Sequence, residues 1–227
     1  EALKKKARDA GLWNLFLPKE YEAYSPGLTN LEYAPLAEAM GSINWASEIF
    51  NCSAPDTGNM EVLERVGTPE QKKQWLEPLL NGEIRSAYAM TEPDVASSDA
   101  KTLACRAVLD GDEWVVDGQK VWTSGAHYCD FGIVVARTDP TLPKHQGLSM
   151  FIVDLREPGI EVRPLMQISG ARGFNEVFFS DARIPAGNLL GEVNQGWNLA
   201  VSMLMFERVS IGAGGGALNA RRGPELA

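Results

Sequence analysis

Over the first third of the chain, apolar residues recur among polar ones at the spacing expected of helices. Thr29 and Glu32 have the spacing of a capping box, in which both side chains bond to the backbone at the start of a helix. The apolar positions that follow step by three residues towards Gly41, a typical helix end: Leu31, Ala34, Ala37 and Met40. The pattern predicts a helix between Thr29 and Gly41.

A second helix start is clearer. Thr68, Pro69 and Gln71 place a cap, a first-turn proline and a reciprocal amide in order. An apolar stripe follows and ends near Gly82: Trp75, Leu76, Leu79 and Leu80. Because proline lacks the amide hydrogen and clashes with the preceding turn, we expect Pro78 to kink or shorten this helix.

From Leu103 to Pro185 the pattern changes to short alternating or β-branched runs, separated by turn pairs such as Asp110-Gly111. Successive strands without helices between them favour an antiparallel sheet or barrel and argue against a doubly wound nucleotide-binding fold. The predicted strands are Cys105–Leu109, Trp114–Val116, Phe131–Ala136, Ser149–Val153, Ile160–Arg163 and Glu176–Phe179.

Helical spacing returns after Pro185. Asn194 is a candidate cap, and one face of the segment carries Trp197, Val201, Leu204 and Arg208. A run of glycines between 212 and 216 then favours either close packing against another helix or a frayed end. The prediction is an α+β protein, with a helical domain over 1–86, a middle β domain over 87–190 and the start of a truncated helical domain over 191–227.

Composition narrows the class of protein. The chain has 227 residues, 44% of them hydrophobic, and a formal charge of −9 at pH 7. A negative field repels nucleic acid and anionic membrane surfaces, so neither is expected as a partner. No apolar run approaches the ~20 residues of a membrane-spanning helix. Since the chain begins at Glu1 without a signal-like start, we expect an N-terminal piece to be missing.

Cysteine and histidine usage excludes two further classes. Cys52, Cys105 and Cys129 lie far apart, which suits buried thiols in a reducing compartment better than a disulfide framework. His127 and His145 have no cysteine pair nearby, so the sequence predicts no zinc site.

Two segments concentrate side chains that suit a ligand. The first, Tyr88–Asp99, combines hydroxyls, carboxylates and turn residues, and its backbone N–H groups can surround phosphate oxygens. The second, Trp122-Thr123-Ser124-Gly125, ends a strand and suits a planar aromatic cofactor, with the indole against its ring and the hydroxyls at its polar edge. Taken singly, an acidic turn and a core tryptophan explain these segments equally well.

Three other motifs carry weaker signals. Ser98 and Lys101 match the SxxK pattern of acyl-serine hydrolases, but its companion motifs are missing. The glycines at 212–217 imitate a dinucleotide fingerprint without a preceding strand. Glu92, Asp94 and Asp99 lack the spacing of a calcium loop, and a solvated acidic loop explains them better.

The sequence resembles the acyl-CoA dehydrogenase family of flavoenzymes from residue 1 to about 212. Thr91-Glu92-Pro93 is similar to the family's flavin-binding signature, and Trp122-Thr123-Ser124 to its second flavin segment. The run from Asn175 to Gly191 resembles a third landmark. Within the family, the run Asn51–Val62, together with Pro93–Asp99, is more similar to the branch that includes human family members ten and eleven.

The resemblance implies a C-terminal four-helix bundle, FAD bound between the bundle and the β domain and across a subunit interface, and a homo-oligomer (a dimer or tetramer). The flavin-binding residues that it implies are Tyr88, Ala89, Met90, Thr91, Ser97, Ser98, Trp122, Thr123 and Ser124. Ser98 is also expected where the pyrophosphate and acyl-CoA approach each other. The substrate-binding residues expected on the last helix are Met205 and Arg208, beside Glu207, and the basic side chains available to CoA are Lys120, Arg172 and Arg208.

The implied reaction is the α,β-dehydrogenation of an acyl-CoA thioester to the trans-2-enoyl-CoA, as in fatty-acid β-oxidation, with electrons passed to an electron-transfer flavoprotein. The family's catalytic glutamate lies in the bundle beyond this chain, so no base is assigned, and Glu92 is expected to be structural. Other branches commonly have glycine and aspartate at the positions of Ala96 and Ser98, so the acyl chain length is not assigned.

Two alternatives remain open from the sequence. The chain without its bundle is consistent with a non-catalytic flavin-binding or assembly module, and the same scaffold also suits an acyl-CoA oxidase or flavin monooxygenase. The expected compartment is the cytoplasm of a bacterium or the mitochondrial matrix of a eukaryote.

Overall fold

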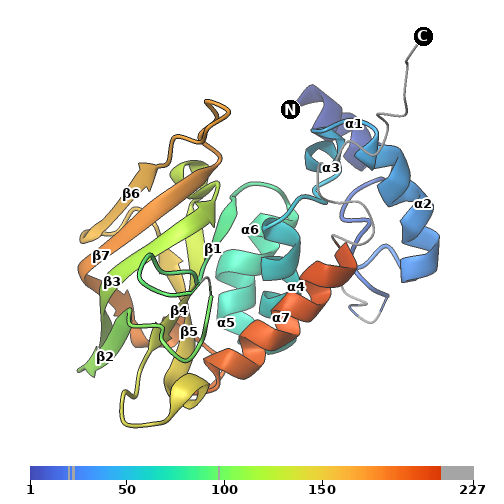
Figure 1. Ribbon diagram of the computed structural model, residues 1–227. Helices are drawn as coiled ribbons and strands as arrows, with labels where there is room; N and C mark the ends of the chain where they lie inside the picture. Colours follow the sequence, from blue (N-terminus) through green and yellow to red (C-terminus); the bar gives the residue numbers. More distant parts are fainter. Residues whose placement is uncertain (20, 22–23, 97, 211–227) are drawn as a thin grey trace.

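The chain folds into a helical part and a β-sheet part that lie side by side, as Figure 1 shows for the computed structural model. The structure describes residues 1–19, 21, 24–96 and 98–210, with side chains through Met205 in the last helix. That helix, α7 (Gly196–Ser210), packs against α4 (Asp56–Val66) and against the sheet. The α+β prediction is therefore confirmed.

Both predicted capping boxes are present in the helical part. At α2, Thr29 Oγ1 accepts from the Glu32 N–H at 3.3 Å, and Glu32 Oε2 accepts from the Thr29 N–H at 2.8 Å. At α5, Thr68 and Gln71 exchange the equivalent bonds at 3.2 and 3.0 Å. The helices before the sheet are α1 (Ala2–Asp9), α2 (Asn30–Gly41), α3 (Ala46–Ile49), α4, α5 (Pro69–Gln71), the π-helical segment η1 (Lys72–Leu76) and α6 (Glu77–Leu80).

The helix that begins at Thr68 changes geometry before Pro78. Over η1 the backbone widens to π-type bonding, and regular α geometry resumes in α6. Because Pro78 has no N–H to donate, the preceding turn cannot continue its ordinary ladder. The apolar stripe predicted for this segment is buried: Trp75, Leu76, Leu79 and Leu80.

The strands form a sheet with the order β6-β7-β3-β2-β4-β5-β8, and β1 pairs with β4 outside this path. Most pairings are antiparallel, as predicted, but β1 runs parallel to β4, and β2 meets β4 in parallel at one pair of residues. The strands are β1 (Ser86–Ala89), β2 (Arg106–Asp110), β3 (Glu113–Ser124), β4 (Phe131–Arg137), β5 (Leu148–Asp154), β6 (Ile160–Pro164), β7 (Phe174–Pro185) and β8 (Leu189–Leu190).

The pairing of β1 with β4 departs from the predicted antiparallel arrangement. Ser86 lies opposite Phe131, and Ala89 lies opposite Val134. Since β2 and β3 intervene in the chain, no local turn signals this pairing. The described residues also form three short 3₁₀ segments: η2 (Ala126–Tyr128), η3 (Lys144–Gly147) and η4 (Ala186–Asn188).

Two apolar clusters lie on opposite sides of β4. Phe131, Ile133 and Val135 join the helices, where the ring centroids of Trp75 and Phe131 are 5.0 Å apart. Val134 and Ala136 join the core enclosed by the sheet. Because successive residues of a strand point to opposite faces, burial on both sides requires an apolar residue at every position. This explains the continuous apolar run of β4.

Helix α7 differs in two details from its sequence prediction. Among its described side chains, Ala200 and Met203 are buried, whereas Val201, on the predicted apolar face, is exposed. Asn194 does not act as the cap, because its Oδ1 accepts from the hydroxyl of Thr138 at 2.6 Å. Tertiary packing against α4 and β5 therefore selects the buried face of α7. Within the described residues, no helix is both long and apolar enough to cross a membrane.

The Glu61 carboxylate on α4 is an isolated buried acid. Its Oε2 atom has no hydrogen-bond partner among the described residues, and burial raises its pKa from 4.5 to about 7. Burial disfavours the charged form, so the folded state binds a proton that the unfolded chain releases. Stability is therefore fully present below about pH 4.5 and declines as the pH rises through 7.

We expect the free energy of unfolding to fall by about 3 kcal/mol between pH 4.5 and 8 through this one group. Glu61→Gln removes that dependence and raises stability at pH 8, measured by denaturant titration across this range. Glu38→Gln, on an exposed position of α2, is the matched control and leaves the pH slope unchanged. An identical slope in wild type and Glu61→Gln contradicts the prediction.

Candidate functional site

The predicted flavin loop begins where β1 ends, and α4 fixes the position of that strand. Asn59 Nδ2 donates to the hydroxyl of Ser86 at 2.9 Å and to the carbonyl of Ala87 at 3.1 Å. Asp56 Oδ1 accepts from the Ser86 N–H at 2.8 Å and from its hydroxyl at 2.6 Å. Since β1 also pairs with β4, Met90 and Thr91 are held at a defined edge of the sheet.

The motif over residues 51–62 thus has a structural role in this chain. Burial raises the pKa of the Asp56 carboxyl, while the guanidinium of Arg85 and the bonds from Ser86 oppose that shift. Arg85 Nε is 2.6 Å from Asp56 Oδ2, and its guanidinium also contacts Glu48. Asn51 Nδ2 donates to the carbonyls of Leu79 and Leu80 at 3.2 Å each. These polar contacts join the helices to one another and to β1.

A buried ion pair connects the loop to β3. Lys120 Nζ is 2.8 Å from Glu92 Oε1, and the side chains are 0% and 5% exposed. Lys120 also donates to the Met90 carbonyl at 3.0 Å. Glu92 accepts from the backbone N–H groups of Ala104 at 2.7 Å and Cys105 at 2.9 Å. Buried charges are tolerated when their polar atoms are bonded in this way.

These contacts decide two of the sequence predictions. Glu92 has the structural role expected of it. Lys120 is wrong as a candidate contact for CoA, because its ammonium group is fully buried and bonded to Glu92 and Met90. Burial also raises the pKa of the adjacent Cys105 thiol to about 11, so no second anion forms beside Glu92 at neutral pH.

The two predicted flavin segments are bonded directly to each other. The N–H of Val121, the residue before Trp122, donates to the carbonyl of Thr91 at 2.9 Å. Within the loop, the hydroxyls of Thr91 and Ser98 lie 2.6 Å apart, and both residues are partly exposed. The structure therefore brings the threonine and tryptophan segments together at one edge of the sheet.

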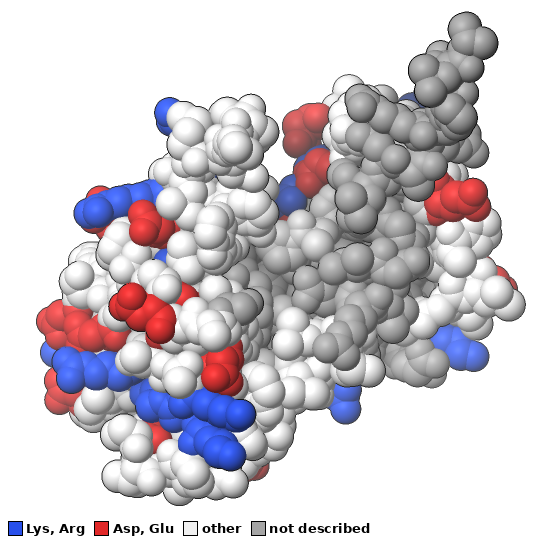
Figure 2. All heavy atoms as spheres, viewed as in Figure 1, with Lys and Arg blue, Asp and Glu red and all other residues white. Residues whose placement is uncertain are grey.

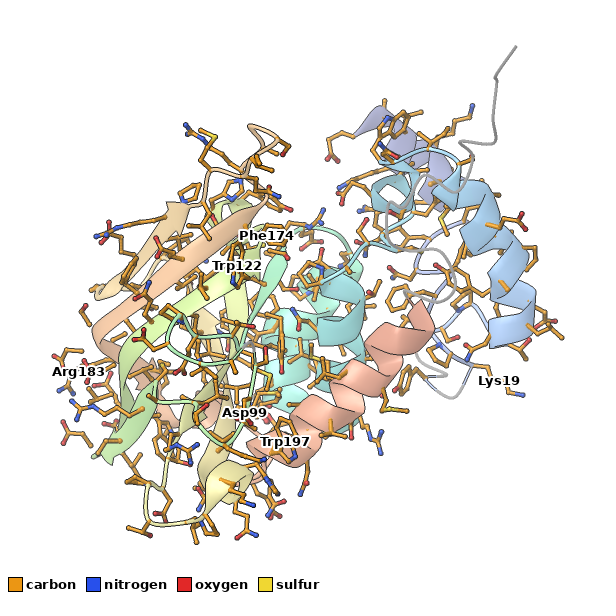
Figure 3. All side chains as sticks on the ribbon, in the orientation of Figure 1. Lys19, Asp99, Trp122, Phe174, Arg183 and Trp197 are labelled. Atoms are coloured by element: carbon orange, nitrogen blue, oxygen red, sulfur yellow. The ribbon has the colours of Figure 1, made fainter. Side chains whose placement is uncertain are left out.

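Trp122 turns its ring out of the sheet. Its φ of 60° is rare for a bulky residue, and the register of β3 against β7 shifts between Lys120 and Thr123. The indole is 57% exposed and packs edge-on against Phe174, with ring centroids 5.9 Å apart. Figure 3 shows both rings at the side of the sheet that faces the helices. An exposed indole supported in this way offers a flat apolar surface to a planar ring.

Thr123 and Ser124 complete this end of β3. The Thr123 carbonyl accepts from Asn175 Nδ2 at 2.8 Å, and Asn175 Oδ1 lies 3.0 Å from His127 Nδ1. Thr123 Oγ1 is buried and lacks a hydrogen-bond partner within the part of the chain that the structure describes. Ser124 pairs with Phe174 and is partly exposed. Sequence reasoning missed the support from Asn175, because it comes from a distant strand.

The other predicted site residues lie on two elements. Tyr88 and Ala89 belong to β1, and the Tyr88 hydroxyl is 3.5 Å from Met90 Sδ. Met205 is exposed on α7. Ser97 and the side chain of Arg208 lie outside the described residues, so the structure leaves both predictions as they stand. Arg172 is exposed in the connection between β6 and β7.

Sequence reasoning also missed a pocket at the N-terminal end of α7, with a volume of about 410 Å³. The rings of His145 and Trp197 lie 5.7 Å apart and are inclined by 41°. Amides dominate the rest of the lining, which comprises Leu142, Gln146, Asn194, Gln195 and Asn198. The available signal was the cluster of amides around Trp197, but the opposite wall comes from a segment about fifty residues earlier.

Charges on the sheet surface are largely paired with one another. Arg183 lies 3.2 Å from both Asp110 and Glu113, and Arg163 lies 2.6 Å from Glu161. Figure 2 shows basic and acidic side chains interspersed over this part of the surface. Among the described residues, no group of three or more His, Cys, Asp or Glu side chains is placed to hold a metal ion.

The geometry thus places a hydroxyl-bearing loop beside an exposed tryptophan at this edge of the sheet. Family models for the N-terminal and middle domains of acyl-CoA dehydrogenases match residues 1–83 and 87–182. The chain belongs to the acyl-CoA dehydrogenase family, which confirms the resemblance.

Named relatives agree with the predicted branch. The chain is 48% identical to acyl-CoA dehydrogenase family member 10 of Mus musculus and 45% identical to family member 11 of Homo sapiens. Each match covers 90% of this chain, but only 20% and 26% of those proteins. A solved Mycobacterium abscessus structure, provisionally named an acyl-CoA dehydrogenase, is 46% identical with a TM-score of 0.87 over 94% of this chain and 53% of that one. The chain thus spans about half or less of these relatives.

The residues at the sheet edge fit FAD, the cofactor that the resemblance implies. Trp122 offers a ring surface, and Thr91, Ser98 and Ser124 offer neutral hydroxyls beside it. The unpartnered Thr123 Oγ1 fits a polar ligand atom, because a buried hydroxyl without a partner costs about 1–3 kcal/mol. Lys120 does not compete for these hydroxyls, because it is buried and bonded to Glu92.

We expect Lys120→Met to lower the free energy of unfolding by about 3–5 kcal/mol, because it leaves the Glu92 charge buried without its partner. The double variant Lys120→Met/Glu92→Gln recovers part of the loss, since no uncompensated charge remains. Lys101→Met, at an exposed position after the same loop, stays within about 0.5 kcal/mol. Denaturant titration measures all three, and a Lys120→Met variant as stable as wild type contradicts this reading of the pair.

Proposed function

We propose that the protein containing this chain is an FAD-dependent acyl-CoA dehydrogenase. The reaction is the α,β-dehydrogenation of an acyl-CoA thioester to the trans-2-enoyl-CoA, with electrons passed to an electron-transfer flavoprotein. The observation that carries the proposal is the direct bond between the two flavin-like segments, from the Val121 N–H to the Thr91 carbonyl. This bond supports a single binding site formed by both segments rather than two unrelated loops.

Residues of this chain have different roles in the proposed flavin site. Trp122 would pack against the ring of the cofactor, while Thr91, Thr123 and Ser124 would bond its polar atoms. FAD, when bound, supplies the hydride acceptor that no amino-acid side chain provides. Neutral hydroxyls stabilise charge in a dry site without competing for the substrate's proton. The family resemblance places the base in the bundle beyond residue 227, so this chain is assigned none.

The pocket at α7 suits the adenine end of CoA. Trp197 and His145 offer aromatic surfaces to a purine, and side-chain amides can bond its edge. The pocket opens at the start of the helix that carries Met205 and Arg208, the residues expected to contact substrate.

Trp197→Ala is therefore expected to raise KM for acyl-CoA about tenfold while leaving FAD affinity unchanged, because only the nucleotide end loses its contact. Steady-state kinetics and flavin titration of the complete gene product measure the two quantities. Trp45→Ala, at an exposed position far from the pocket, serves as the control. An unchanged KM in Trp197→Ala removes this assignment without affecting the flavin site.

The reaction itself is tested with the FAD-loaded complete gene product and a panel of acyl-CoA thioesters under anaerobic conditions. The expected result is bleaching of the flavin absorbance by at least one thioester, restored by an electron-transfer flavoprotein. No bleaching with any thioester contradicts the proposed dehydrogenase and leaves the non-catalytic flavin-binding or assembly module as the alternative. Rapid reoxidation by oxygen with peroxide release identifies an oxidase instead.

The proposal extends to assembly and location. Because the resemblance places part of the flavin site across a subunit interface, the protein acts as a homo-oligomer, a dimer or tetramer. The three free cysteines suit a reducing compartment, the bacterial cytoplasm or the mitochondrial matrix.

A further inference from the structure

The side-chain hydroxyls of Thr91 and Ser98 are hydrogen-bonded to each other in the loop that follows β1. Their oxygens are 2.6 Å apart, and either one can be the donor. The backbone of Thr91 is held independently, since its carbonyl accepts from Val121 while the residues on either side of it bond to Lys120. Ser98 lies at the other end of the loop, and its side-chain hydroxyl contacts Thr91.

The number of hydroxyl protons limits how many hydrogen bonds Thr91 and Ser98 can donate to a ligand. Two hydroxyls carry two protons, and the bond between them uses one. If Thr91 donates to Ser98, the Thr91 proton is not available to a ligand. If Ser98 donates to Thr91, the Thr91 proton remains free, and a hydroxyl that accepts one hydrogen bond is a stronger donor in another.

We infer that Ser98 is a positioning residue that donates to Thr91 Oγ1 and thereby directs the Thr91 proton to an acceptor atom of the flavin ring. This inference rests on the proposed function. It differs from the sequence expectation that Ser98 lies at the pyrophosphate and the acyl-CoA, because here its hydroxyl acts through Thr91. A ligand acceptor beside Thr91 selects this donor arrangement, since the opposite arrangement leaves that acceptor unpaired.

The test is a double-mutant cycle in the complete gene product, read by FAD titration and by the absorption spectrum of the bound flavin. Ser98→Ala is expected to weaken FAD binding about 3- to 10-fold and to shift the flavin absorption band. Thr91→Val, which keeps the shape and removes the hydroxyl, weakens binding at least as much. In the double variant, Ser98→Ala adds no further loss, because the residue through which it acts is gone.

Conservative variants separate orientation from simple packing. Ser98→Thr keeps the hydroxyl and is expected to restore both the affinity and the spectrum. Ser98→Cys has a similar shape and a weaker donor, so its flavin spectrum is expected to lie between those of wild type and Ser98→Ala. If alanine disturbs the loop, Ser98→Cys is compared with wild type in its place. Ser180→Ala, at an exposed hydroxyl on β7, is the control and changes neither readout.

Two outcomes overturn the inference while leaving the proposed function in place: a Ser98→Ala spectrum and affinity equal to wild type, or losses from Ser98→Ala and Thr91→Val that add in the double variant. Additive losses show that Ser98 contacts the cofactor separately, as at its pyrophosphate. Failure of the wild-type protein to bind FAD is the distinct result that removes the proposed function, and this inference with it.

Discussion

The buried ion pair between Lys120 and Glu92 is the contact on which the geometry of the site depends. Removing two charges from water is costly, and the cost is offset only when every remaining polar atom is bonded. Here Lys120 also donates to the Met90 carbonyl, and Glu92 accepts from two backbone N–H groups. These requirements hold the loop after β1, the approach to β2 and the middle of β3 in one arrangement. The shape of the site therefore depends on the Lys120–Glu92 ion pair, to which no contact with the proposed ligand is assigned.

The helical part contributes to the site through β1. Asn59 and Asp56 on α4 bond the strand from one side, and β4 pairs with it from another. A short strand held in this way has little freedom to slide, because a slip of one residue would exchange its buried and partly exposed faces. The position of Thr91 beside Val121 follows from this register. Packing between helices and sheet thus controls the loop that emerges from the sheet.

Part of the site could be predicted from residues adjacent in the chain. The Thr91 and Trp122 segments stood out through their hydroxyls, their tryptophan and their family resemblance. The partners of these segments could not be predicted in the same way. Lys120 resembled a free cation in sequence because nothing local indicates that a lysine will be buried against a distant carboxylate. The bond from Asn175 to β3 and the pocket at Trp197 were missed for the same reason, since each depends on segments joined only by the fold.

Local patterns determined the capping boxes at Thr29 and Thr68, most strand positions and the α+β class, because these features depend on backbone geometry over a few residues. Only the tertiary structure decided that β1 runs parallel to β4, that α7 buries Ala200 and Met203, and that Asn194 bonds to Thr138 instead of capping a helix. The physical reason is that burial and pairing are properties of whole surfaces in contact. A side chain's final partner depends on which distant surface displaces water from it.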